Sequence, residues 1–173
     1  IARQDNLVRF DATLGDVQLL GGYTFGGQPD MSANATSALG ATYTKGDSAV
    51  GGYVQFLNNV TDTETRKIYG LGGNYKITKD FVAFGGYMHR SAEVSLQENS
   101  VWTLGANYEI TPQVQLSAGY LSDDQSGSAA LDGSRTVGFV TANYKFSRRT
   151  DIYAVVDTNE VEGGYAKPAF MGT

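Results

Sequence analysis

Few side chains in this sequence are suited to catalysis or to binding a transition metal. The chain contains 1 histidine and no cysteine, so the usual ligands of a zinc site are missing. The single histidine, His89, would have to serve any Ser-His-Asp triad, and no aspartate lies near it in the sequence. We therefore interpret His89 as a structural ring rather than a catalytic base, and we expect no catalytic residue and no cofactor.

Carboxylates are more numerous, and they could bind a hard cation. Asp123, Asp124 and Asp132, together with Asp30, form acidic groups of the type that calcium prefers. Their spacing does not match a calcium-binding loop, and polar surface segments commonly carry such residues. The sequence therefore predicts no metal site, with calcium in a loop as the open alternative.

Basic side chains fall into two groups. Arg9, Arg66, Arg90 and Arg135 lie within segments of alternating polarity, whereas Lys45, Lys79, Arg148 and Arg149 lie in short polar turns. The formal net charge is −5 and the sequence pI is about 4.8, which argues against a nucleic-acid-binding protein.

The composition predicts β structure. The chain has 173 residues, of which 18% are charged and 12% aromatic, with 22 glycines. Aromatic side chains favour pleated surfaces, and their abundance contradicts disorder. No run of about 18 apolar residues exists, which excludes a membrane-spanning helix. A spanning strand needs only about ten alternating residues, and that pattern agrees with a mean hydropathy of −0.26.

A hairpin repeat of about 33 residues runs through the chain. Segments such as 17–23, 81–87 and 114–120 alternate with segments such as 39–43, 71–75, 104–108 and 140–144. Short turns connect one end of successive segments, and long polar links connect the other, which is typical of an antiparallel up-and-down transmembrane β-barrel. We expect ten strands, at about residues 6–13, 16–26, 37–46, 48–58, 65–77, 80–91, 99–110, 113–122, 134–146 and 150–158, all in one domain spanning 1–173.

Alternation along the strands separates two faces. Trp102, Leu104, Ala106 and Tyr108 share one face of a strand whose other face carries residues such as Asn107. Apolar faces rich in alanine and glycine suit lipid better than a packed core, and aromatic residues near strand ends suit a membrane-interface girdle, where His89 also falls. The predicted girdle consists of Tyr23, Tyr43, Tyr75, Tyr87, Trp102, Tyr108, Tyr120 and Tyr144. Phe84 and Phe139 fall on the polar face without an explanation.

Four features of the sequence together match a known family of proteins: residues 5–11, residues 17–26, the Leu-Gly-Ala-Asn-Tyr repeats and residues 146–153. They resemble the trimeric general porins of Gram-negative bacteria, in particular the β-proteobacterial type, and the resemblance extends over essentially the whole chain. Such porins are sixteen-stranded barrels with an inward loop after the fifth strand. The resemblance implies that this chain corresponds to strands six to fifteen plus part of the last surface loop, 159–173, without the closing strand.

The resemblance also implies a function. Such a protein would form a water-filled channel for passive diffusion of small hydrophilic solutes and ions across the outer membrane of a Gram-negative bacterium. It would be no enzyme, and its partners would be the lipid and lipopolysaccharide of that membrane and, as a homotrimer, further copies of itself. Two alternatives remain open: a secreted or surface β-sandwich that binds a partner through its long loops, and a ten-stranded outer-membrane hydrolase that depends on His89.

Pore-lining residues follow from strand parity. If Phe10 faces lipid, Arg9 and Asp11 face the lumen, and the same spacing directs Arg66, Arg90 and Arg135 inward. In similar porins, arginines line one wall of the narrowest zone, opposite acidic groups of the inward loop. We therefore expect neutralisation of Arg9 to lower the preference for anions.

Overall fold

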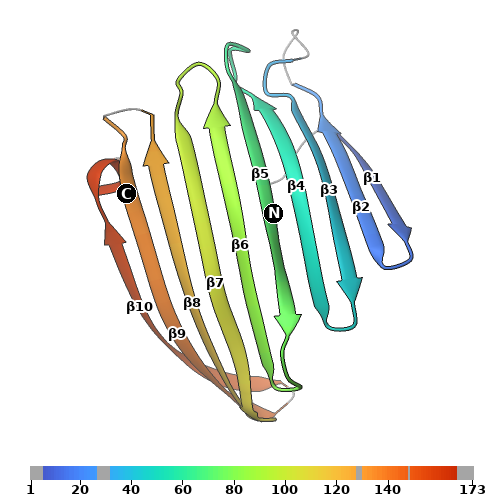
Figure 1. Cartoon of the computed structure of the whole chain (residues 1–173), viewed down its shortest axis with the longest axis vertical. Coiled ribbons are helices and arrows are strands. Elements are labelled where there is room, and N and C mark those ends of the chain that lie inside the picture. Colours follow the sequence, from blue (N-terminus) through green and yellow to red (C-terminus); the bar gives the residue numbers. More distant parts are fainter. Residues whose placement is uncertain (1–5, 27–31, 128–129, 148, 167–173) are drawn as a thin grey trace.

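A single antiparallel sheet makes up the molecule. The computed structural model describes residues 6–26, 32–127, 130–147 and 149–166. Within them, ten strands each pair with their neighbours in sequence (Figure 1), which confirms the up-and-down fold. The strands are β1 Leu7–Leu14, β2 Val17–Thr24, β3 Thr36–Lys45, β4 Ser48–Asn58, β5 Thr65–Lys76, β6 Phe81–Ala92, β7 Glu98–Thr111, β8 Val114–Ser126, β9 Gly133–Ser147 and β10 Thr150–Val161.

Short turns close one end of the sheet, and longer loops connect the other end (Figure 1). Gly15 and Gly46 occupy two of the short turns with φ of 60° and 59°, a left-handed conformation that glycine adopts without steric cost. This asymmetry is typical of outer-membrane barrels. In the part of the chain that the structure describes, no helix is long and apolar enough to cross a membrane.

The last strands differ in extent from the prediction. β8 continues to Ser126, and β10 continues to Val161, so the first residues of the segment 159–173, predicted as a surface loop, belong to a strand. A short 3-10 helix, η1, follows at Gly163–Ala166. Residues 167–173, like Asp30 and Arg148, lie outside the described residues.

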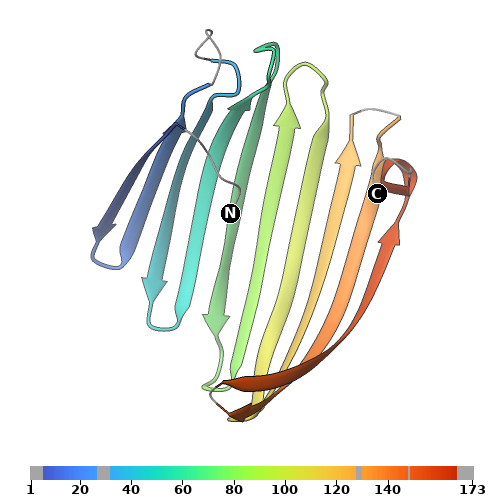
Figure 2. The ribbon, with the colours of Figure 1, turned by 180° about the vertical axis from the view of Figure 1, so that it is seen from behind.

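The sheet is curved into a trough. Figure 2 shows its concave side, because the edge strands β1 and β10 come towards the viewer while the central strands lie behind. β1 and β10 lie at opposite ends of the strand order. The described residues therefore form an open piece of barrel wall, with a convex and a concave face.

This wall is one layer thick. Among the described residues, no side chain of any size is fully buried, and the buried hydrophobic residues are Ala33, Ala35 and Ala92. A β-sandwich would enclose large aliphatic side chains between two sheets. The sandwich alternative is therefore inconsistent with the structure.

Candidate functional site

One face of the sheet is apolar from β1 to β10. Residues paired across neighbouring strands share a face, so the register assigns every side chain of the strands to one of two sets. Leu104 pairs with Gly85 on β6 and with Tyr120 on β8, and the residue is 66% exposed. The same set contains Phe10, Leu39, Leu71, Val140 and Val156, which are all exposed.

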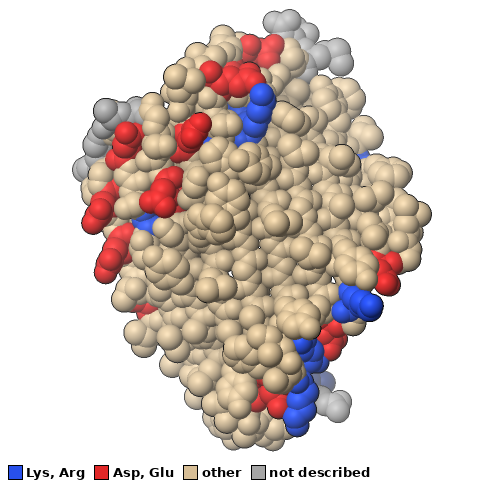
Figure 3. All heavy atoms as spheres, viewed as in Figure 1, with Lys and Arg blue, Asp and Glu red and all other residues tan. Residues whose placement is uncertain are grey.

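Charged side chains are confined to the ends of this face. Those that the register places there are Lys45, Lys67, Glu98, Asp124 and Glu160, each within a few residues of a strand end. The convex surface in Figure 3 accordingly shows charges towards two opposite ends and an uncharged band between them. A charge at the centre of a bilayer costs a barrel about 2–4 kcal/mol, so this band is suited to contact hydrocarbon.

All eight residues of the predicted aromatic girdle lie on the apolar face. Four of them lie close to the turns, and Tyr23 and Trp102 lie nearer the loops. Tyr87 and Tyr120 lie near the middle of β6 and β8. The ring centroids of Tyr87 and Trp102 are 4.3 Å apart. Tyr69, which is not part of the predicted girdle, belongs to the same cluster, with its ring 5.1 Å from that of His89.

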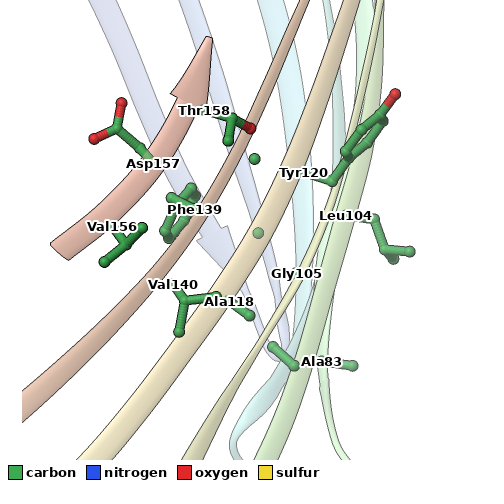
Figure 4. A pocket seen from close by; sticks show the side chains of 13 residues that line it. Ala83, Leu104, Gly105, Ala118, Tyr120, Phe139, Val140, Val156, Asp157 and Thr158 are labelled. Atoms are coloured by element: carbon green, nitrogen blue, oxygen red, sulfur yellow. The ribbon is translucent and has the colours of Figure 1, made fainter.

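A shallow apolar groove crosses β7 to β10 in the middle of this face. Small residues such as Ala106 and Ala118 form part of its lining, with Leu104 and Tyr120 beside them. Figure 4 shows Leu104 and Tyr120 pointing away from the sheet on the side opposite Phe139. The apolar lining of this groove is suited to contact with lipid acyl chains.

The five predicted pore-lining residues all lie on the opposite, concave face. Arg9 donates from Nε and a terminal nitrogen to the two carboxylate oxygens of Asp11, at 2.7 and 2.8 Å. Arg66 Nε lies 3.6 Å from a carboxylate oxygen of Glu64. Arg135 Nε donates to Oδ1 of Asn159 on β10 at 3.1 Å.

The structure brings two of these arginines together and separates the others. Arg66 on β5 pairs with Ala92, two residues along β6 from Arg90, so the two lie on adjacent strands. Strands are about 4.8 Å apart, which puts Arg135 on β9 about 14 Å from β6 along the sheet. Arg9 on β1 is about 19 Å from β5 by the same measure.

Glu64 belongs to a contact between neighbouring loops. Its Oε1 accepts a hydrogen bond from the backbone N–H of Ser95 at 2.7 Å. Hydrogen bonding from Ser95, with a smaller contribution from Arg66, lowers the pKa of Glu64 below its ordinary value. The carboxylate therefore stays ionised next to Arg66 and reduces the net positive charge at the loop-side end of β5.

Three aromatic rings on the concave face lie over glycines of the next strand. A β-carbon built on Gly119 would lie 2.5 Å from the Phe139 ring, and one on Gly105 would lie 2.3 Å from the Phe84 ring. Tyr53 covers Gly70 in the same way. Aromatic residues are known to compensate for glycine in a neighbouring strand, which explains why Phe84 and Phe139 occupy the polar face.

Among the residues that the structure describes, His89 does not form a catalytic triad. Its Nδ1 lies 3.1 Å from Oγ of Ser100, and both belong to the apolar face. Asp124 pairs with Ser100 from the far side, so the serine separates the aspartate from the histidine. In a triad, the serine and the carboxylate bind different nitrogens of the imidazole. Here Asp124 lies beyond the serine and not beside the imidazole.

The aspartates proposed as calcium ligands also diverge. Asp123 and Asp124 point to opposite faces because they are consecutive in β8. Within the described ranges, no group of three or more acidic or histidine side chains could hold a metal ion.

A family model described as Gram-negative porin matches residues 1–164. The chain belongs to the Gram-negative porin family. This membership places it in the outer membrane of a Gram-negative bacterium, and the trough is the wall of a porin barrel. A search of curated proteins finds no match.

Solved porin structures share the fold. The anion-selective porin from Comamonas acidovorans is 16% identical, with a TM-score of 0.81, and the alignment covers 92% of this chain and 50% of that one. OmpT of Vibrio cholerae in its trimer form is 19% identical, with a TM-score of 0.75 over 91% of this chain and 55% of that one. The channel DcaP of Acinetobacter baumannii is 14% identical, with a TM-score of 0.74, covering 93% and 57%. The chain thus spans about half the length of these structures.

Proposed function

We propose that this porin chain forms part of a water-filled channel for passive diffusion of small hydrophilic solutes and ions. The observation that carries the proposal is the uncharged band on the convex face of all ten strands, opposite a concave face that carries charge. Lipid on one side and water on the other is the arrangement that such a wall requires.

We infer that the protein has no catalytic activity. Family and fold are those of channels, and Nδ1 of the one histidine lies beside Ser100, whose far side faces Asp124. Transport through the pore would then depend only on the width and the charge of the pore.

We propose two kinds of partner, one from the convex face and one from the solved porin structures. The apolar band of the convex face would contact the lipid and lipopolysaccharide of the outer membrane. Assembly as a homotrimer is supported by the trimer form of the Vibrio cholerae OmpT structure, which shares the fold.

Selectivity would depend on how charge is distributed over the concave face. Basic and acidic side chains are nearly balanced there, and Arg9 is already neutralised by Asp11. In the adjacent pair Arg66 and Arg90, Glu64 offsets part of the charge of Arg66, so the positive charge of the pair rests mainly on Arg90. Arg90 is therefore a stronger candidate than Arg9 for the basic side of the pore. The concave charges are Arg9, Arg66, Lys76, Arg90, Arg135 and Lys145 against Asp11, Glu109, Asp123, Asp151 and Asp157.

Planar-bilayer recordings on the complete protein test the function and the role of this pair. We expect stepwise channel insertion, and in a KCl gradient we expect Arg90→Gln to shift the reversal potential towards cation preference. Lys79→Gln is the matched control, because Lys79 is a turn residue whose side chain is 89% exposed. A protein that inserts without conducting would refute the channel, and equal shifts in both variants would refute the role of Arg90.

A further inference from the structure

The segment after β10 turns back onto the concave face. η1, Gly163–Ala166, follows β10 directly, and Tyr165 contacts Asn99 of β7 and Asp123 of β8. Both of these residues belong to the concave set, because Asn99 pairs with Arg90 and Asp123 pairs with Arg135. The segment therefore covers the loop-side end of β7 to β9 from the side that would be the lumen.

A network of hydrogen bonds holds Tyr165 on the wall. Its hydroxyl donates to Oδ2 of Asp123 at 2.6 Å and accepts from Nδ2 of Asn99 at 3.0 Å. The same Nδ2 lies 3.2 Å from Oδ1 of Asp123 and 3.2 Å from Oε1 of Gln125. The side-chain amide of Gln125 donates to the carbonyl of Leu131 at 2.7 Å.

Two polar residues of the concave face are buried, and the segment around η1 lies over this part of the wall. Asn99 and Gln125 are each 7% exposed and are the buried polar residues of the described part of the chain. Polar groups on a water-facing wall are buried only when something lies over them. The hydrogen bonds of Nδ2 of Asn99 and of the Gln125 amide replace bonds to water, whereas Oδ1 of Asn99 has no partner among the described residues.

Glycines allow the backbone of residues 162–164 to approach the backbone of residues 131–133 closely, independently of the hydrogen-bond network. A β-carbon on Gly164 would lie 2.1 Å from the carbonyl oxygen of Leu131, and one on Gly133 would lie 2.3 Å from that of Glu162. The N–H of Gly164 donates to the carbonyl of Asp132 at 2.7 Å. Gly163 has φ of 58°, which permits the tight reversal.

We propose that residues 163–166 form an inward constriction of the pore and that Tyr165 is the residue that positions it. The proposal rests on the proposed channel function and adds a specificity-determining element to it. The segment occupies space on the lumen side of β7 to β9 and covers Asp123, which would otherwise face passing ions. Release of the segment would both widen the pore and expose this carboxylate.

The hydroxyl of Tyr165 suits this role over a wide pH range. Burial, and next the hydrogen bond to Asp123, raises its pKa above the ordinary value. Because the raised pKa favours the neutral form, the hydroxyl remains a donor at neutral pH, and docking would weaken only in strongly alkaline solution.

Single-channel recordings on the complete protein in KCl test the proposal with Tyr165→Phe. Loss of one hydrogen bond to a charged group raises the undocked population about tenfold to a hundredfold. We expect a larger mean conductance, more frequent fluctuations and passage of larger neutral polymers. Tyr153→Phe is the matched control, since it removes a hydroxyl from an exposed tyrosine of β10 and should leave all three unchanged.

Gly164→Ala gives a second, independent test, because its new methyl group would displace the segment from the carbonyl of Leu131. It should reproduce the changes produced by Tyr165→Phe. A wild-type protein that conducts, together with two variants that match it in conductance, fluctuation and polymer cutoff, would overturn the constriction while leaving the channel intact. A wild-type protein that does not conduct would refute the proposed function itself.

Discussion

Leu104→Arg is expected to destabilise the complete protein in a bilayer by about 2–4 kcal/mol. Leu104 lies in the middle of β7 on the apolar face and is exposed. A guanidinium at this position would have to enter hydrocarbon far from either interface. The free energy of unfolding, measured by denaturant titration in lipid vesicles, checks the value.

Thr103→Arg is the matched control for this prediction. Thr103 is the neighbour of Leu104 in β7, and its side chain belongs to the concave set because it pairs with Gly86 and Leu121. An arginine there would remain in water, so we expect a change within about 0.5 kcal/mol. Equal destabilisation by the two substitutions would contradict the assignment of the faces.

Gly73→Ala is expected to cost about 1–3 kcal/mol of folding free energy. A β-carbon at this position would lie 2.4 Å from the carbonyl oxygen of Ala49 and 3.1 Å from Cα of Val50. Both atoms belong to the backbone of β4, so β4 and β5 would have to separate. The same vesicle titration measures the loss.

Gly21→Ala supplies the control, because the nearest atoms to its new methyl group would lie 3.9 Å away, which is ordinary van der Waals contact. Gly21 also lies within a strand on the apolar face. We expect little change, or a small gain from the reduced flexibility of the unfolded chain. A loss at Gly21 equal to that at Gly73 would show that glycine serves strand flexibility rather than close packing.

Strand order and facing could be predicted from the sequence because both depend on short-range features. Alternation with period two fixes which residues share a face, as in Trp102, Leu104, Ala106 and Tyr108. The difference between short turns and long links fixes up-and-down pairing. The predicted ends of β8 and β10 fall short of the observed ends at Ser126 and Val161. Residues such as Asp123 and Asn159 are polar because they lie on the water-facing side of the wall, and in the sequence such polar residues resemble a loop.

The contacts of the candidate site could not be predicted from single strands. Parity assigns Arg66 and Arg90 to one face, but their closeness depends on the register between β5 and β6. Tyr165 reaches Asn99 across 66 positions of sequence, and no local pattern encodes such a contact. Phe84 and Phe139 break the polar alternation, and their glycine partners become apparent only once the strands are paired.

The most direct test of the account measures which side chains touch lipid. The chain contains no cysteine, so single cysteines at 101–104 and 106–108 can each carry a nitroxide label in vesicle-embedded protein. We predict that labels at Trp102, Leu104, Ala106 and Tyr108 collide with oxygen dissolved in the bilayer. Labels at Val101, Thr103 and Asn107 should instead collide with a water-soluble nickel complex. The reverse alternation, or none along β7, would contradict a wall with lipid on its convex face and water on its concave face.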